Sequence, residues 1–363
     1  MNEIWFELIN ILYEHGYNAY IVGGYVRDRL LNINSSDIDI TTNAKPKEIK
    51  EVFPDCIIKS DSYGAVIINY KNYHFDVTTM REEMEYLDSR HPSGIIYVDD
   101  LKKDLLRRDF TINALCLDKD KNLIDLIGGK KDLDKKVIRT ISDSNKSLKD
   151  DALRILRAIR FASLLNFSLS DEIKVAIKNN KYLLTKLSSL RKKEELDKIF
   201  GSKKAKEGIQ LIKELDLVDE LNLTNIDRVK DYSDIIGIWA MINTKEYDFS
   251  ASEKDLINKI NIVYEMDNLD DLVLYHYGCY VNVLAGINKG LKKKDIIAKY
   301  ENLPIKKRDE INISAKEICE IYHKKPGPFI GKIYLVIENK IVLRELENNN
   351  NKIKEFIEKY RNE

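Results

Sequence analysis

One segment near the N-terminus, YIVGGYVRDRLLNINSSDIDITT (residues 20–42), constrains the fold more than any other part of the chain. The apolar residues before the glycines are typical of the end of a buried strand. Gly23 and Gly24 remove side chains where the backbone must turn or approach another group closely. A short helix is predicted over 25–31. The segment therefore predicts a strand, a glycine turn and a helix in immediate succession.

The same segment carries two acidic residues on the next predicted strand, over residues 37–40. Because strand side chains alternate, Asp37 and Asp39 share one face of that strand. Two carboxylates on one face repel each other unless a cation lies between them, and oxygen-only ligands suit Mg²⁺. An exposed loop with two solvated acids is the competing interpretation. A third acid, Asp76, lies on a predicted hairpin strand, where capping of a nearby threonine explains it equally well.

An anion site is predicted beside these carboxylates. The backbone N–H groups at the start of the helix, near Gly24, combine with the cation of Arg27 to favour a phosphate. The paired glycines alone are explained as often by a plain turn. The order strand, glycines, helix and acidic strand is more specific, because it would hold a triphosphate and its metal side by side.

Composition excludes several classes of protein. The 363 residues are enough for two or more domains, and 44% hydrophobic with 33% charged residues is typical of a globular protein. Lys+Arg and Asp+Glu are both 60, so the net charge neither favours nor excludes a nucleic-acid partner. The four cysteines form no CxxC pair, which favours reduced thiols in a cytosol over a zinc site or a disulfide framework. The first residues predict an amphipathic helix and no signal peptide, and no apolar run approaches membrane-spanning length.

Two kinds of pattern divide the chain. Up to about residue 137, short strands alternate with helices, and hairpins are predicted over 64–79 and 114–126. After residue 142 the strand signals stop and apolar residues recur with helical spacing. We therefore predict an α+β protein in which a mixed α/β head precedes an all-helical remainder.

Five segments, in this order along the chain, resemble the motifs of one enzyme family. They are GGYVRD with DID, LLRRDFTINAL (105–115), LIDLIGGKKDL (123–133), DDALRILRAIRF (150–161) and LRKKEELDKIF (190–200). With them the chain resembles the DNA-polymerase-beta-like nucleotidyltransferases, in particular the class II tRNA nucleotidyltransferases and the bacterial poly(A) polymerases. The resemblance implies a nucleotidyltransferase head over 1–141, a helical nucleotide-selecting neck over 142–202, and a helical body and tail that bind tRNA over 203–363.

The RRDFTIN motif also has a direct physical interpretation. Arg108 is a donor for phosphate, and Asp109 is an acceptor suited to a ribose, because an enzyme that takes ribonucleotides must hydrogen-bond the 2′-OH. Asn113, one helical turn further on, would support Asp109. A salt-bridged helix cap is the alternative. The glycines 128 and 129 that follow would either let the head move against the rest or form a plain turn.

The DDALRILRAIRF segment predicts a helix on which Asp151 and Arg154 are i,i+3 neighbours. Cytosine and adenine both present an amino donor beside a ring-nitrogen acceptor, so an Asp and an Arg together can accept them. Uracil and guanine present the reversed order and would leave polar groups unpaired, which rejects them. An ordinary surface ion pair is the alternative. Arg160 faces a different direction from Asp151, and the resemblance assigns Arg157 and Arg160 to nucleotide or RNA phosphates.

The resemblance implies template-independent addition of CCA to the 3′ end of tRNA in the cytoplasm. CTP and ATP would be the substrates, and Mg²⁺ the cofactor of a two-metal nucleotidyl transfer that releases pyrophosphate. Asp37 and Asp39 would be the catalytic and metal-binding residues. The nucleotide-binding residues would be Gly24, Arg27, Arg108, Asp109, Asn113, Asp151, Arg154, Arg157 and Arg160.

Three alternatives remain open. The segment 81–105, including Arg90, His91 and Pro92, resembles the flexible loop of relatives that add the terminal A. An enzyme that adds only A, or a poly(A) polymerase, would share the same motifs. A catalytically inactive RNA-binding relative is disfavoured, because both DID carboxylates are present. A kinase or GTPase is poorly supported, because the chain contains no GxxxxGK[ST].

Overall fold

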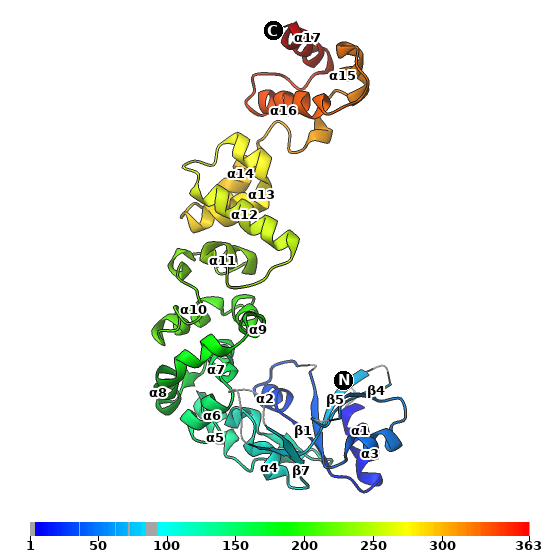
Figure 1. The fold of residues 1–363 in the computed structure, drawn as a ribbon, viewed down its shortest axis with the longest axis vertical. Coiled ribbons are helices and arrows are strands. Elements are labelled where there is room, and N and C mark those ends of the chain that lie inside the picture. The colour runs from blue at the N-terminus through cyan, green and yellow to red at the C-terminus, as the bar shows by residue number, and fades with distance from the viewer. Residues whose placement is uncertain (1–3, 36, 62, 72, 85–92, 363) are drawn as a thin grey trace. The chain divides into compact units, whose positions relative to one another are not determined.

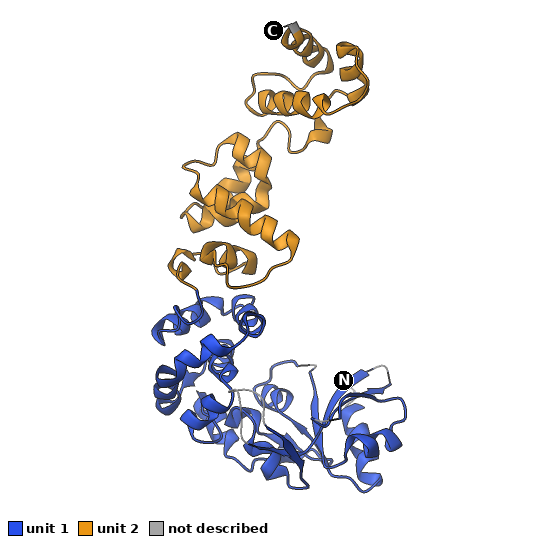
Figure 2. Ribbon diagram, in the orientation of Figure 1, with its two compact units in different colours: residues 1–222 blue, residues 223–363 orange. Residues whose placement is uncertain are grey.

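The computed structural model, drawn in Figure 1, describes residues 4–35, 37–61, 63–71, 73–84 and 93–362. The chain forms two compact units, Met1–Asn222 and Leu223–Glu363 (Figure 2). The expected division into head, neck, and body with tail stays a prediction.

A mixed sheet of seven strands, in the order β3-β4-β5-β2-β1-β8-β9, supports the first unit. Strands β2 and β5 run parallel, and the other neighbouring pairs are antiparallel. The pairs β4–β5 and β8–β9 are the two predicted hairpins. The strands are β1 (Ala19–Val22), β2 (Asp39–Thr42), β3 (Ile57–Ser60), β4 (Ala65–Tyr70), β5 (Tyr73–Thr79), β8 (Cys116–Leu117) and β9 (Leu123–Ile124).

The strand register brings the glycine turn and the acidic residues to one place. Strand β1 ends at Val22, directly before the glycines, and Val22 pairs with Asp39 on β2. Asp39 in turn pairs with Asp76 on β5. The strand predicted over 37–40 begins only at Asp39, so Asp37 lies in the chain that leads into β2. Strand alternation therefore does not position Asp37, which precedes the strand.

Short helices cover the sheet and carry several of the motifs. One apolar cluster joins α4 to the strands and consists of Val22, Met80, Leu101, Leu105, Ala114 and Cys116. The helices of this region are α1 (Ile4–Glu14), α2 (Gly24–Leu30), α3 (Pro46–Val52), α4 (Leu101–Leu106), the 3₁₀ turn η1 (Thr111–Asn113) and α5 (Gly129–Lys135). A separate pair, β6 (Arg81–Glu83) and β7 (Ile95–Tyr97), is antiparallel. The expected loop residues Arg90, His91 and Pro92 lie outside the described residues.

The rest of the first unit is helical, as predicted, apart from one short strand. β11 (Ser168–Leu169) pairs in parallel with β10 (Val137–Ile138), so strand pairing extends beyond residue 142. Helix α7 packs against α9 and α10. These helices are α6 (Ser144–Asp150), α7 (Leu153–Leu165), α8 (Asp171–Asn180), η2 (Lys181–Lys186), α9 (Ser189–Phe200) and α10 (Ala205–Glu214). The predicted α+β class is confirmed.

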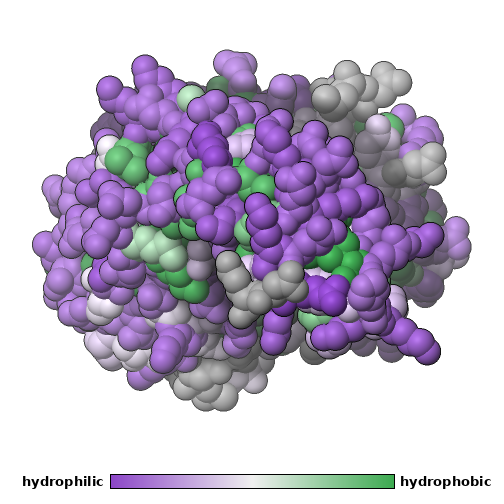
Figure 3. All heavy atoms as spheres, turned by 90° about the horizontal axis from the view of Figure 1, so that it is seen from above, coloured by the Kyte–Doolittle hydropathy of each residue, from purple (hydrophilic) through white to green (hydrophobic). Residues whose placement is uncertain are grey.

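The second unit contains helices in all of its regular structure. Helix α12 packs against α11 and α13, and α13 against α14. Its elements are η3 (Ile226–Arg228), α11 (Ile235–Ile242), α12 (Ala251–Glu265), α13 (Asp271–Asn288), α14 (Lys293–Glu301), η4 (Arg308–Glu310), α15 (Ala315–Tyr322), α16 (Phe329–Val342) and α17 (Asn350–Asn362). Across the described part of the chain, no helix combines the length and apolarity needed to span a membrane. The face in Figure 3 carries mainly hydrophilic residues.

The two glycines after β9 form a tightly bonded turn. Asp125 accepts hydrogen bonds from the backbone N–H groups of Gly128 (2.7 Å), Gly129 (2.9 Å) and Lys130 (2.9 Å). Gly128 has φ 84°, in the left-handed region that favours glycine. A Cβ on Gly129 would lie 2.1 Å from the carbonyl oxygen of Thr111. Gly129 thus lets α5 contact the backbone of the RRDFTIN segment. This contact fits the second alternative for the two glycines, a plain turn.

We expect Gly129→Ala to lower the free energy of unfolding of the first unit by about 1–3 kcal/mol, since backbone atoms cannot retreat as a flexible side chain can. Trp5 and Trp239 lie in different units, so Trp5 fluorescence in a Trp239→Phe background would report on the first unit. Gly331→Ala in α16 is the matched control, because a Cβ there meets nothing within 4 Å. Gly331 lies in the second unit, so this control should leave the unfolding transition that Trp5 reports unchanged. Equal effects of both substitutions would contradict the packing argument.

Candidate active site

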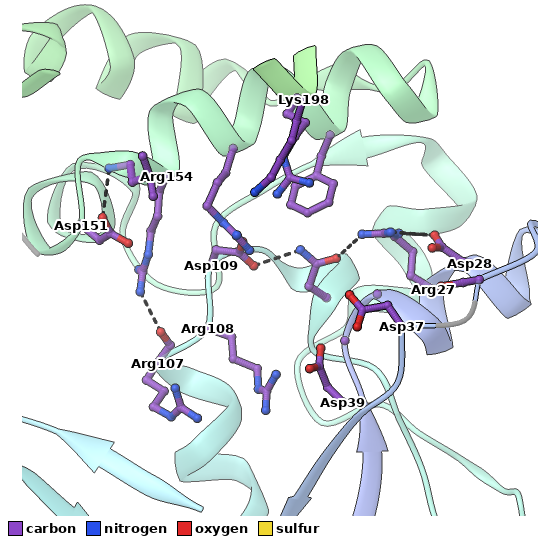
Figure 4. Close-up of a pocket in the computed structure, with 18 of the residues that line it drawn as sticks. Arg27, Asp28, Asp37, Asp39, Arg107, Arg108, Asp109, Asp151, Arg154 and Lys198 are labelled. Atoms are coloured by element: carbon purple, nitrogen blue, oxygen red, sulfur yellow. Dashed lines mark hydrogen bonds and ion pairs between the residues drawn. The ribbon is translucent and has the colours of Figure 1, made fainter. Parts of the chain in front are cut away.

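All of the site residues predicted from the sequence line one cavity of about 690 Å³ in the first unit. The cavity lies where the glycine turn, the start of β2, the RRDFTIN segment and α7 meet (Figure 4). Arginines are numerous along its wall, and carboxylates are interspersed among them. Such a surface suits a polyanionic ligand that carries its own cations.

The two carboxylates of the DID motif lie close together at the sheet end of the cavity (Figure 4). Burial raises the pKa of Asp39, and the negative charge of Asp37 raises it further. A Cβ on Gly23 would stand 3.4 Å from Oδ2 of Asp39, so the glycine keeps this carboxylate accessible. The ionised form of Asp39 is therefore disfavoured beside Asp37, and a cation bound between the two carboxylates would stabilise it.

Asp76 is in register with Asp39 but has a different partner. Its Oδ1 accepts from Nζ of Lys59 at 2.7 Å, and both side chains are about half exposed. Asp76 does not line the cavity. Among the described residues, no group of three or more His, Cys, Asp and Glu side chains is arranged to hold a metal ion. Other carboxylates of the cavity, such as Asp28 and Asp109, pair with arginines, which leaves Asp37 and Asp39 as its candidate metal ligands.

A hydrogen-bond chain joins α2 to α7 across the floor of the cavity. Arg27 donates from Nε to Asp28 (2.8 Å) and from Nη1 to Oδ1 of Asn113 (2.7 Å). Asn113 donates from Nδ2 to Oδ1 of Asp109 at 3.0 Å. Asp109 also accepts from Nε and Nη2 of Arg157, at 2.8 and 2.5 Å. The predicted support of Asp109 by Asn113 is therefore present, whereas Arg157 contacts Asp109, a partner that the sequence did not suggest.

The arginines of the RRDFTIN motif are held by a carboxylate that is fully buried. Asp104 accepts from Arg107 (2.7 Å) and Arg108 (3.1 Å), and also from Oγ1 of Thr41 on β2 (3.2 Å). Nε of Arg108 is buried and has no hydrogen-bond partner among the described residues. The charge of Arg108 also lowers the pKa of Asp39, against the effects of burial and Asp37. Sequence reasoning missed Asp104, although its i,i+3 and i,i+4 spacing to the arginines was a usable signal.

The predicted helix over the DDALRILRAIRF segment is interrupted at Asp151, one of the two residues expected to contact the base. Helix α6 ends at Asp150, α7 begins at Leu153, and Asp151 between them has φ −142° and ψ 102°. The expectation of i,i+3 neighbours on one helix is therefore wrong. Instead, Oδ1 of Asp151 accepts from the N–H of Leu153 (3.0 Å), and its carbonyl accepts from the N–H of Arg154 (3.1 Å). Both residues still line the cavity, as the sequence predicted.

The guanidinium group of Arg154 is buried and fixed by two neutral acceptors. Nη1 donates to Oγ of Ser147 and Nη2 to the carbonyl oxygen of Arg107, both at 2.7 Å. Arg160 lies further along α7 and donates from Nε to Oε2 of Glu195 on α9 at 2.7 Å. Arg160 thus has a partner different from Asp151, as expected.

Phe161 was not predicted as a site residue, yet three arginines surround its ring. The guanidinium carbons of Arg160, Arg27 and Arg157 lie 4.4, 4.9 and 5.5 Å from the ring centroid. A cation over an aromatic face is attracted by the ring quadrupole. Phe161 therefore helps to gather three like charges beside one cavity. A phenylalanine on an apolar helix face carries no sequence signal that separates this role from ordinary core packing.

The ion pair between Asp109 and Arg157 predicts an acid-sensitive contribution to stability. Burial disfavours the ionised carboxylate, but Arg157 and Asn113 outweigh it and lower the pKa of Asp109 to about 2. The folded pKa is below the ordinary 3.8, so the stabilisation is full above about pH 4 and is lost as the pH falls toward 2. We expect Asp109→Asn to cost about 2 kcal/mol at pH 7, and the difference from wild type to shrink between pH 4 and 2.

Denaturant titrations of both proteins at several pH values would measure this difference. Asp171→Asn is the control, because the Asp171 side chain is 94% exposed. A difference between wild type and Asp109→Asn that stays constant down to pH 2 would contradict the assignment.

Comparisons with known proteins agree with this architecture. The family model described as "Poly A polymerase head domain" matches residues 19–139. A model for tRNA nucleotidyltransferase domain 2 matches residues 244–357, and one described as "Probable RNA and SrmB- binding site of polymerase A" matches 166–223. The crystal structure of the Bacillus stearothermophilus CCA-adding enzyme in complex with CTP is similar, with a TM-score of 0.83 and 26% identity. That similarity covers 99% of this chain and 97% of the other.

Curated relatives match over nearly the whole length of the chain. The CCA-adding enzyme of Lactococcus lactis subsp. cremoris is 33% identical over 92% of this chain and 90% of its own length. The CCA-adding enzyme of Bacillus licheniformis is 32% identical over 97% of this chain and 96% of its own length. Identity of this extent, together with the head-domain match and the shared fold, shows that the chain belongs to the family of CCA-adding enzymes.

Proposed function

We propose that this protein adds CCA to the 3′ end of tRNA, using CTP and ATP and no template strand. The observation that carries the proposal is that the carboxylate pair Asp37 and Asp39 lines the same cavity as Asp151 and Arg154. We assign Asp151 and Arg154 to the base and call them the base-reading pair. Family membership supports it, because CCA-adding enzymes are nucleotidyltransferases. In each addition the terminal 3′ hydroxyl of the RNA gives up its proton to solvent, and its oxygen forms a bond to the α-phosphorus. The bond from the α-phosphorus to the oxygen that bridges to the β-phosphorus breaks, and pyrophosphate leaves.

We propose Mg²⁺ as the cofactor, held by Asp37 and Asp39. The donor set fits this ion, because Mg²⁺ takes one or two carboxylates and completes its shell with water and substrate phosphates. The crowded negative charge at Asp39 supports the same assignment. Bound there, the metal would lower the pKa of the attacking hydroxyl and neutralise charge on the triphosphate.

The nucleotide would lie along the arginine wall. Arg108 has a buried Nε without a partner among the described residues, and we assign it, with Gly24 and Arg27, to the triphosphate. We assign Asp109 to the ribose, with Asn113 in support. An ionised carboxylate accepts about four hydrogen bonds. Four protein donors, from Phe110, Asn113 and Arg157, already bond to Asp109, so a 2′-OH would bind there by displacing or sharing one of these bonds.

The base would be read by Asp151 and Arg154. Asp151 accepts from the amino group of cytosine or adenine, and Arg154 donates to the adjacent ring nitrogen. Arg157 and Arg160 lie on the same side of α7 as Phe161, and we assign them to nucleotide or RNA phosphates. Their ion pairs with Asp109 and Glu195 hold them in place before the substrate arrives.

We further propose a division into a head over 1–141, a neck over 142–202, and a body and tail over 203–363 that bind tRNA. The head-domain match to residues 19–139 supports the first boundary. The cytoplasm is the proposed site of the reaction, and the four cysteines are unpaired thiols. Full CCA addition is preferred over A-only addition and over a poly(A) polymerase, because the curated relatives named above are CCA-adding enzymes.

A gel assay would test the function directly. Transcripts of tRNA ending before CCA, after C and after CC would each receive CTP, ATP, both, UTP or GTP. We expect three additions that end in A only when CTP and ATP are both present, and none with EDTA. The double variant Asp37→Ala/Asp39→Ala should reduce the rate by at least about a thousandfold, because no protein ligand would remain for the metal.

The same gel separates the alternatives. Addition of a single A, restricted to the CC-ended transcript, would identify an A-adding enzyme. Long products from ATP alone would identify a poly(A) polymerase. No incorporation on any transcript, with RNA binding intact, would identify an inactive RNA-binding relative.

A second experiment concerns the ribose. Because Asp109 is assigned to the 2′-OH, wild type should prefer CTP to dCTP, and Asp109→Asn should lose about tenfold or more of that preference. The ratio of kcat/KM for the two nucleotides measures it. Asp28→Asn is the matched control, because Asp28 lines the same cavity and pairs with Arg27. An unchanged ratio in Asp109→Asn would remove Asp109 from this role.

A further inference from the structure

Ser147, a residue outside the predicted site, contacts both members of the base-reading pair. Its hydroxyl oxygen accepts from Nη1 of Arg154 at 2.7 Å. Its carbonyl oxygen accepts from the backbone N–H of Asp151 at 3.2 Å. Ser147 lies on α6 and is 1% exposed, so no solvent competes for these bonds.

The hydrogen bond that Arg154 donates to Ser147 sets the direction of the Arg154 guanidinium group. The Arg154 side chain is buried, and a guanidinium group presents five N–H donors in a rigid fork. One donor is fixed by Ser147 and another by the carbonyl of Arg107. Since the fork is planar, two fixed donors set the direction of the rest. Figure 4 shows the Arg154 side chain extending down to the Arg107 carbonyl.

Two neighbouring carboxylates are alternative partners toward which the Arg154 guanidinium group could turn. The charge of Arg154 acts on both Asp109 and Asp150, which shows that these two acids lie within its electrostatic reach. A neutral hydroxyl holds the guanidinium by geometry and adds no negative charge beside it. Without that hydroxyl, a buried donor would lack its acceptor, and the group would gain by turning toward a carboxylate.

The contact to Asp151 fixes the other half of the pair. The chain bends at Asp151, and the bond to the Ser147 carbonyl is the last backbone bond of α6. Because Ser147 bonds to both residues, it sets the distance and direction between the acceptor Asp151 and the donor Arg154. Base selection without a template requires this relation, because the Watson–Crick edge presents its donor and acceptor at a fixed spacing.

We propose that Ser147 is a positioning residue that sets the specificity of the Asp151–Arg154 pair for cytosine and adenine. The proposal rests on the proposed function, since it gives those two residues the reading of the base. We assign Ser147 no contact with the nucleotide, because its hydroxyl acts through Arg154.

The test compares Ser147→Ala with Ser144→Ala. Ser144 is also buried on α6, one turn earlier, but its hydroxyl bonds to Oγ1 of Thr140, and in the described part of the chain no hydrogen bond joins that hydroxyl to Asp151 or Arg154. For each protein, kcat and KM are measured with CTP and UTP on tRNA lacking CCA. Binding of CTP and UTP without tRNA is measured by calorimetry, with thermal unfolding as a check of the fold.

We expect Ser147→Ala to reduce the preference for CTP over UTP about tenfold, mainly through KM, which corresponds to about 1.4 kcal/mol. The variant Ser147→Thr, which keeps the hydroxyl, should restore most of the preference, and Ser144→Ala should keep it. In an Arg154→Ala background, Ser147→Ala should change the preference no further, because its effect passes through that arginine.

Two outcomes would overturn the proposal: a wild-type preference in Ser147→Ala, or an equal loss in Ser147→Ala and Ser144→Ala. If Ser147→Ala does not fold, Ser147→Cys keeps the volume but weakens the acceptor, and the same outcomes apply. Failure of the proposed function is distinguishable, because wild type itself would then show no preference for CTP in either assay.

Discussion

The bond between Asp109 and Arg157 is the interaction on which the rest of the site depends. Asp109 follows α4 on the sheet side of the cavity, and Arg157 lies on α7 on its helical side. Both oxygens of the carboxylate are in use, since Asn113 and the backbone N–H of Phe110 also donate to it. This buried, charge-assisted pair joins the motif that we assign to the ribose to the helix that we assign to the base. A change on either side of it therefore displaces the other.

The cavity balances two opposite electrostatic demands. A triphosphate needs several cations close together, and the proposed Mg²⁺ needs one or two carboxylates that are free to bind it. Three of the arginines have a carboxylate partner other than Asp37 and Asp39: Asp28 for Arg27, Asp104 for Arg108 and Glu195 for Arg160. The DID carboxylates are left facing the cavity, where burial and mutual repulsion raise the pKa of Asp39. The site thus suits the proposed substrate, a triphosphate that arrives with its metal.

Much of this arrangement was predictable from local patterns. The glycine turn after a buried strand, the two hairpins and the helical second part of the chain all follow from residue types and apolar periodicity, which act over a few residues. The helix break at Asp151 was not predictable in the same way. The DDALRILRAIRF segment has helical spacing throughout, but the bonds of Asp151 to Leu153 and of Ser147 to Arg154 separate α6 from α7. Strand β2 likewise begins two residues later than alternation suggested.

The sequence by itself determined which residues meet in the cavity and the family to which the chain belongs, because motifs constrain chemistry through residue type and order. Only the tertiary structure decided the partners within the cavity. Arg157 bonds to Asp109 across 48 residues and Arg27 to Asn113 across 86, and such contacts depend on packing between segments distant in sequence. Buried arginines must satisfy their donors with whatever acceptors the fold brings near, and that choice has no signature along the chain.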